Sequence, residues 1–309
     1  MGKTPLAIYL PNTQDEDRFY RVSEREIIKF RAELNLTEND ILCSWITRPY
    51  EDRWSSVGLE AWLQLAEVDR RMHLYAVGLP QSLLTIIADS DIDIRNRVYL
   101  RESLDTDCEL RTCYSASDLF LHSTKIGESF GNVIAEAQLC QTPAIVLSTP
   151  HRTNAQVEVA GHGVGGIVVR NLAGYCEALR TLANDKDIRV QLGMAGRKRI
   201  LANYSPGQLV VDMAAVFDIC VHCRRHAMDL PKALAMQGLA TQYSSRALHA
   251  GYRDISGGLS LLSAVLLSMR APLSKVASLN SWVYPRWHTR GWEFVSKHWF
   301  KFMEKFKSD

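Results

Sequence analysis

The sequence has no long uninterrupted apolar run, and none near its start. Because no apolar segment follows Met1, we expect no signal peptide and a cytoplasmic location. The longest apolar stretch, around residues 259–269, is too short and too rich in serine to cross a bilayer. Any membrane contact is therefore expected to be peripheral, at the inner membrane surface.

The sequence also lacks a marked charge excess and a paired cysteine framework. Its formal net charge of +2 over 309 residues gives no reason to expect a nucleic-acid partner. The seven cysteines are odd in number and scattered, which indicates reduced thiols. An apolar content of 47% is ordinary for a globular protein, and the length suffices for one large or two modest domains.

Strand and helix patterns alternate from about residue 40 to residue 203, and a further helix is expected after them. The expected strands are 41–47, 72–77, 97–100, 119–122, 144–147 and 166–169, and the expected helices are 57–69, 81–88, 107–116, a helix ending at 139, 172–184, 188–203 and 206–225. This alternation predicts an α/β protein with a doubly wound parallel sheet.

The composition changes near Leu230 and Pro231. Residues 228–309 contain eleven Lys or Arg against five Asp or Glu, and four of the seven tryptophans. We therefore predict a Rossmann-like domain over residues 1–227 and a basic, Trp-rich, mostly helical extension over residues 228–309.

The most informative segment is residues 127–137, GESFGNVIAEA, which joins an expected strand to an expected helix. Two glutamates, Glu128 and Glu136, lie eight positions apart, with Gly131 between them. In α/β sheets, ligands bind outside the carboxyl ends of the strands, and a helix N-terminus offers free N–H groups to an anion. Two carboxylates beside an anion site suggest a ligand with both phosphates and hydroxyls, such as a nucleotide-sugar.

This segment resembles the donor-binding motif of the family-four glycosyltransferases, which are retaining enzymes of the GT-B fold. The matching residues are Glu128, Phe130, Gly131, Glu136, Ala137, Thr142 and Pro143. The resemblance implies a Rossmann-like half of a GT-B fold that transfers a sugar without a metal ion or other cofactor, with a nucleotide-sugar as substrate. It also implies polysaccharide biosynthesis.

Two arginines follow the first expected strand. Arg48 and Arg53 align with the Arg and Lys that bind the donor diphosphate in the resembled family, although both neighbouring glycines of its pattern are missing. An arginine in place of lysine keeps the charge but changes the geometry of phosphate binding. The alternative is a pair of solvated loop arginines.

The resemblance also assigns roles within the motif. Glu136 would accept hydrogen bonds from the ribose hydroxyls. Glu128 would contact sugar hydroxyls or stabilise positive charge near the anomeric carbon. The backbone N–H groups of Phe130, Gly131 and Asn132 would face the sugar and phosphate. The alternative is two ordinary helix glutamates, one of them near a helix N-terminus.

Three further patterns carry weaker signals. The acidic run 89–93 mimics an Asp-x-Asp metal site but is expected to be a solvated loop. The segment 220–226 contains Cys and His, the ligand types of zinc, but continues a helix. His162, between two glycines, is expected to be a turn residue and not a catalyst.

The C-terminal segment 292–306 places aromatic and apolar residues on one helical face, with lysines around it. This pattern is typical of a cationic amphipathic helix on an anionic membrane. The alternative is a helix that packs on its own domain or on a partner protein.

The segment 9–20 resembles the hinge through which the chain of these glycosyltransferases enters its second domain. The resemblance therefore covers about residues 5–225 and begins in the middle of the family's length. We expect the acceptor domain to come from a partner protein or from a missing part of the chain. The rival hypotheses are a non-catalytic donor-binding or scaffolding subunit, a nucleotide-sugar epimerase, and a membrane-surface adaptor.

Overall fold

The computed structural model describes residues 11–149 and 152–236. The chain divides between Gly258 and Leu259 into two units, and all described residues belong to the first. The domain boundary near residue 228 stays a prediction, since the extension lies outside the described residues from residue 237 onward. The expected amphipathic helix over 292–306 lies outside them as well.

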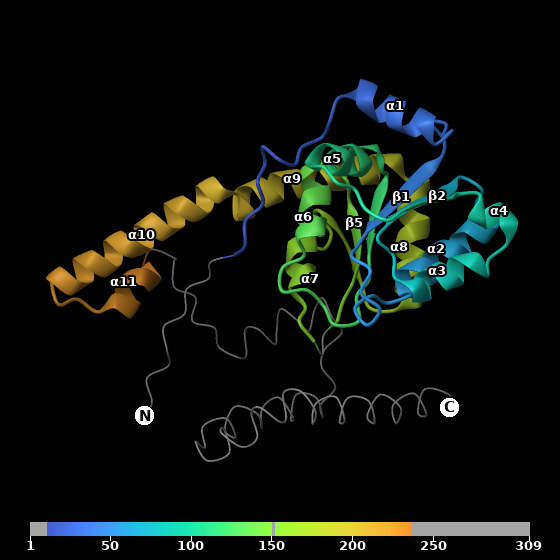
Figure 1. Ribbon diagram of the computed structural model, residues 1–309. Coiled ribbons are helices and arrows are strands. Elements are labelled where there is room, and N and C mark those ends of the chain that lie inside the picture. Colours follow the sequence, from blue (N-terminus) through green and yellow to red (C-terminus); the bar gives the residue numbers. More distant parts are fainter. Residues whose placement is uncertain (1–10, 150–151, 237–309) are drawn as a thin grey trace, which may run out of the picture. The chain divides into compact units, whose positions relative to one another are not determined.

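Six parallel strands form one sheet in the order β3-β2-β1-β4-β5-β6 (Figure 1). The strands are β1 (Ile41–Ile46), β2 (Met72–Val77), β3 (Val98–Arg101), β4 (Leu119–His122), β5 (Ala144–Leu147) and β6 (Gly166–Val169). The order reverses between β1 and β4. The carboxyl ends of these two strands therefore flank the switch point at which open α/β sheets bind ligands.

Helices connect successive strands and cover both faces of this sheet (Figure 1). The helices are α1 (Glu24–Glu33), α2 (Val57–Val68), α3 (Gln81–Ala88), α4 (Ile92–Arg95), α5 (Asp107–Ala116), α6 (Asn132–Leu139), α7 (Ala155–Ala160), α8 (Leu172–Asn184), α9 (Lys186–Tyr204), α10 (Pro206–Arg225) and α11 (Leu230–Met236). The predicted doubly wound α/β fold is confirmed.

Strand β1 is buried on both faces of the sheet. All six of its residues are buried. Cys43 and Trp45 belong to a core cluster with α2, α3, α4 and α8. Leu42 and Ile46 belong to a second cluster with α5, α6, α7 and the end of α9. Successive side chains point to opposite faces of a strand, so a continuous apolar run becomes a strand buried on both sides.

The structure corrects one expectation and adds two helices. The acidic run 89–93 is not wholly a loop, because Ile92 and Asp93 lie in the short helix α4. Helix α7, which we did not predict, begins at Ala155. The helix α1, which we did not predict, packs beside α5.

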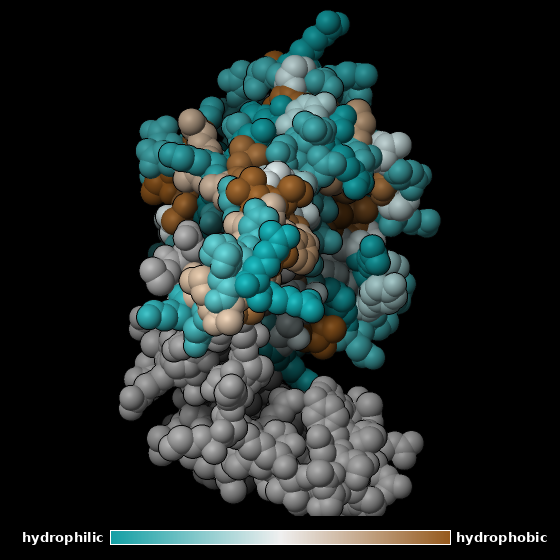
Figure 2. Space-filling view, turned by 90° about the vertical axis from the view of Figure 1, so that its left-hand side faces the viewer, coloured by the Kyte–Doolittle hydropathy of each residue, from teal (hydrophilic) through white to brown (hydrophobic). Residues whose placement is uncertain are grey.

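In the described part of the chain, one helical stretch, Lys186–Arg225, is long and apolar enough to cross a membrane by length and composition. A single stretch of this kind is weak evidence for a membrane span. On α10, Val210, Val211 and Phe217 are 61–65% exposed. The side of the molecule on which α10 lies shows apolar residues interspersed among polar ones (Figure 2).

Candidate functional site

Two loops meet at the switch point of the sheet, one after β1 and one after β4. The backbone carbonyl of Arg53 accepts hydrogen bonds from the Lys125 amide at 2.8 Å and from the Thr124 hydroxyl at 2.9 Å. The Ser55 amide donates to the Ser123 carbonyl at 3.2 Å. These bonds tie the two loops into one unit, so side chains from both loops have fixed neighbours.

Glu128 and Arg53, both predicted from the sequence as donor-site residues, form an ion pair between these loops. The guanidinium Nη2 of Arg53 donates to Oε2 of Glu128. The second oxygen, Oε1, lies 3.3 Å from Nε2 of His122, which ends β4. The Arg53 side chain is 34% exposed, whereas that of Glu128 is only 10% exposed. The pair is therefore open to solvent on the arginine side.

Burial alone would raise the pKa of Glu128. The hydrogen bond with His122 and the interaction with Arg53 outweigh this effect and bring the pKa below its ordinary value. The backbone of Glu128 is also held, because its amide donates to the Gln156 side chain at 3.0 Å and its carbonyl accepts from the Ala155 amide at 3.1 Å. The site thus contains a charged carboxylate in a fixed position.

Gly131 allows the chain to turn from this loop into α6. Its φ of +104° lies in the left-handed region that favours glycine, and α6 begins at Asn132. Phe130 is buried, with its ring 5.3 Å from that of Tyr204. Within the described residues, the amides of Phe130, Gly131 and Asn132 donate no hydrogen bond. These amides are available to an anion at the helix N-terminus.

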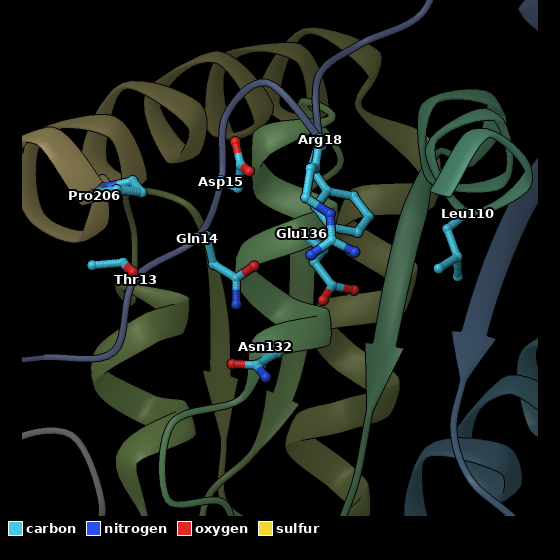
Figure 3. A pocket seen from close by; sticks show the side chains of 9 residues that line it. Thr13, Gln14, Asp15, Arg18, Leu110, Asn132, Glu136 and Pro206 are labelled. Atoms are coloured by element: carbon cyan, nitrogen blue, oxygen red, sulfur yellow. The ribbon is translucent and has the colours of Figure 1, made fainter. Parts of the chain in front are cut away.

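Glu136 lies one turn further along α6, on the same side of the helix as Asn132 (Figure 3). The hydroxyl of Tyr114 on α5 donates to its carboxylate at 3.0 Å. Burial raises the pKa of Glu136 to about 7, although the Tyr114 hydrogen bond and the charge of Arg18 act in the opposite direction. Glu136 is therefore a carboxylate whose charge changes near neutral pH.

Glu136 opens onto a cavity of about 330 Å³ (Figure 3). The cavity lies between the segment before α1, helix α5 and the first turns of α6 and α10. Its lining residues are Thr13, Gln14, Asp15, Arg18, Phe19, Leu110, Asn132, Glu136 and Pro206. Arg18 reaches toward Glu136 from the N-terminal segment (Figure 3) and is held by two 2.9 Å hydrogen bonds to Asp107 on α5. The cavity offers hydrogen-bonding groups of both kinds to a polar ligand.

Arg48 is placed differently from Arg53. It is exposed, and its backbone carbonyl accepts a 2.7 Å hydrogen bond from the indole of Trp54. In the parts of the chain that the structure describes, it has no ion pair. The structure therefore brings together Arg53 and Glu128, and places Asn132 and Glu136 on one cavity, but leaves the Arg48 side chain at the surface.

Four residues of the site were not predicted: His122, Tyr114, Arg18 and Gln156. His122 could have been suspected, because it ends the strand that leads into the motif. Tyr114 and Arg18 lie on other elements, and no spacing in the sequence connects them with Glu136. Tertiary packing alone makes these contacts.

The weaker motifs do not form a metal site in the described residues, where no group of three His, Cys, Asp or Glu side chains could hold an ion. His162 lies between the turn residues Gly161 and Gly163 and forms an isolated bridge with Gly166. Its Nδ1 accepts a 3.0 Å hydrogen bond from the amide of Val168.

Comparison with known protein families gives one match over this site. The family model described as Glycosyl transferases group 1 matches residues 45–185. The match contains Arg48, Arg53 and the whole motif from Glu128 to Glu136, and it covers fewer than half of the 309 residues. No curated protein sequence matches the chain.

Solved structures of glycosyltransferases share the fold. HepE from Anabaena, in complex with UDP-glucose, is 19% identical with a TM-score of 0.56, over 68% of this chain and 56% of its own. Sucrose-phosphate synthase from Thermosynechococcus elongatus is 19% identical with a TM-score of 0.55, over 69% of this chain and 52% of its own.

The C-terminal domain of the group 1 protein LpcC from Francisella tularensis is 14% identical with a TM-score of 0.53. The likeness covers 62% of this chain and 99% of that domain. This chain thus spans about half the length of HepE and of the synthase, and nearly all of the isolated domain. At these identities the likeness establishes the fold, a Rossmann-like half of the GT-B architecture.

Proposed function

We propose that this glycosyltransferase domain binds a nucleotide-sugar and serves as the donor half of a retaining, metal-independent transferase of hexosyl type. The acceptor would be a glycan or a lipid-linked glycan, as in polysaccharide biosynthesis. The observation that carries the proposal is the Arg53–Glu128 pair beside the free amides of α6, at the switch point of the sheet. HepE, which shares the fold, was crystallised with UDP-glucose, and this favours a ligand of that class.

Different residues would stabilise the leaving diphosphate and the sugar during transfer. When the sugar–diphosphate bond breaks, negative charge develops on the leaving diphosphate. Arg53, Arg48 and the N-terminal amides of α6 would stabilise that charge, in the place where other enzymes use a metal ion. The buried, charged Glu128 would contact the sugar hydroxyls or stabilise positive charge near the anomeric carbon.

Glu136 would hold the nucleoside by accepting hydrogen bonds from the two ribose hydroxyls. Asn132 shares the cavity with Glu136 and lies nearer the start of the helix. The two glutamates would therefore bind different parts of one ligand, the sugar at Glu128 and the ribose at Glu136. The α6 N-terminus between them would bind the diphosphate.

The test is isothermal titration of UDP, GDP and ADP, with and without their sugars, into the wild type and a Glu136→Ala variant. Glu67→Ala is the matched control, because Glu67 is an exposed glutamate at the C-terminal end of α2, and the loop with Arg53 precedes the opposite end of that helix. We expect one nucleotide to bind the wild type and the control, and to bind the Glu136→Ala variant at least tenfold more weakly. No binding of any nucleotide by the folded wild type would contradict the proposal.

We further propose that the acceptor domain comes from a partner protein or another part of the polypeptide, and that the protein works in the cytoplasm or at the inner membrane surface. Donor binding without any sugar transfer, in the presence of such a partner, would favour the rival function of a non-catalytic donor-binding subunit.

A further inference from the structure

His122 lies at the centre of the site, yet the proposed function gives it no role. It is the last residue of β4 and is 1% exposed. Its amide donates to the Tyr175 hydroxyl at 3.0 Å, and that hydroxyl donates to the Ile145 carbonyl at 2.9 Å. The backbone of His122 is thereby fixed to the neighbouring strand and to α8.

Among the described residues, the imidazole ring contacts the carboxylate of Glu128 and the ring of Trp54. Its Nε2 lies 3.3 Å from Oε1 of Glu128. The Trp54 ring meets it edge-on, with 5.8 Å between the ring centroids and 85° between the planes. Its Nδ1 is buried and has no hydrogen-bond partner among the described residues. Since an unpaired buried N–H costs more than an unpaired lone pair, the proton is assigned to Nε2, which donates to Glu128.

The two side chains that contact the Glu128 carboxylate, Arg53 and His122, differ in their exposure to solvent. Arg53 is 34% exposed, projects from a loop and would be drawn to a bound diphosphate. His122 ends a strand in the core, and its ring is enclosed. A ligand that attracts Arg53 therefore leaves His122 as the remaining partner of the carboxylate.

We propose that His122 is a positioning residue that keeps the Glu128 carboxylate turned toward the donor sugar once Arg53 contacts the diphosphate. This inference rests on the proposed function, and it assigns a residue outside the motif to the recognition of the sugar. It predicts that loss of the Nε2 donor weakens binding of the nucleotide-sugar and leaves the affinity for the nucleotide unchanged.

The experiment compares His122→Phe, which fills the space without a donor, with His122→Gln, whose amide nitrogen falls near the position of Nε2. For each variant, calorimetry gives Kd for UDP, GDP and ADP and for UDP-glucose, GDP-mannose and ADP-glucose. The measured quantity is the ratio of Kd for the nucleotide-sugar to Kd for its nucleotide. Thermal unfolding verifies that each variant is folded.

We expect His122→Phe to raise this ratio about tenfold while Kd for the nucleotide stays within about twofold, and His122→Gln to restore most of the wild-type ratio. An unchanged ratio in His122→Phe, or an equal loss of nucleotide and nucleotide-sugar binding, would overturn the inference while leaving the proposed function intact. Absence of binding by the wild type would overturn both.

If His122→Phe does not fold, His122→Asn replaces it, because the amide of asparagine corresponds to Nδ1 and does not reach the Nε2 position. The same difference between the Asn and Gln variants is then expected. Equal ratios in these two variants would overturn the inference.

Discussion

Replacing Glu136 with Gln should make the folded protein more stable above neutral pH but not in mild acid. Burial raises the pKa of Glu136 from 4.5 to about 7. Below about pH 4.5 the folded and unfolded states both carry the proton, so there is no penalty. Between pH 4.5 and 7 the unfolded state loses its proton first, so the contribution of Glu136 to stability falls and then levels off above about pH 7.

The size of the effect follows from the shift. About 2.5 pKa units correspond to roughly 3 kcal/mol as an upper limit, at 1.36 kcal/mol per unit. Glutamine has nearly the same shape and does not ionise. Part of this change already lies below pH 5. The difference in unfolding free energy between Glu136→Gln and the wild type should therefore move in favour of the variant by up to about 2.5 kcal/mol between pH 5 and pH 8.

Urea unfolding at pH 5, 6, 7 and 8 measures this difference, with Glu67→Gln as an exposed control that should show no such trend. A second assay uses UDP-glucose, whose diphosphate diester does not titrate near pH 7. Its affinity should rise with pH through about 7 in the wild type, because only the ionised carboxylate accepts hydrogen bonds at both oxygens, and should stay flat in Glu136→Gln. A stability difference independent of pH, or identical pH profiles of binding, would refute the reasoning.

Three further predictions concern the loops around the site. Arg53→Met should weaken binding of the nucleoside diphosphate by about 10–100-fold in calorimetry, because a charge-assisted contact is lost. An unchanged Kd would exclude Arg53 as a phosphate ligand. Gly127→Ala should lower Tm much more than Gly163→Ala. Both glycines have φ of +74°, but a Cβ at Gly127 would collide with the backbone oxygen of Thr153, whereas one at Gly163 meets nothing within 4 Å. Equal losses would contradict this. Thr142→Val should cost about 0.5–1.5 kcal/mol in urea unfolding. The buried carbonyl of Tyr114 keeps its 3.1 Å hydrogen bond from the Ser117 amide but loses the 2.5 Å hydrogen bond from the Thr142 hydroxyl. A neutral effect would show that the bond is not needed.

The order of strands and helices could be predicted well, because buried parallel strands and amphipathic helices leave clear periodic patterns. Strand β4 and helix α10, for example, have the predicted ends. The three helices that were not predicted are short or lie outside the main alternation. For α1 a signal was present, since Ser23 and Glu26 form a capping box.

The site could be predicted only as far as the topology determines it. The carboxyl ends of parallel strands lie at one edge of a sheet, so Arg53 after β1 and Glu128 after β4 could both be expected at that edge. The adjacency of β1 and β4, which makes the two residues neighbours, comes from the structure. Their direct ion pair, and the contact of Glu128 with His122, depend on side-chain directions that no spacing specifies.

The surroundings of Glu136 could be predicted even less well from the sequence. From the sequence alone it could have been an exposed helix glutamate. In the structure, α5 and the segment before α1 lie against it, and the resulting burial raises its pKa, although the Tyr114 hydrogen bond and the Arg18 charge act in the opposite direction. Such long-range contacts are invisible to local patterns.

Hydrogen–deuterium exchange with and without UDP-glucose, GDP-mannose and ADP-glucose tests the central claim most directly, because it reports both binding and its place. We predict that one donor slows exchange at residues 127–136, which contain Glu128 and the α6 N-terminus, and at the cavity segment 13–19. Unchanged exchange with all three donors, or slower exchange only outside these two segments, would contradict a nucleotide-sugar site at this edge of the sheet.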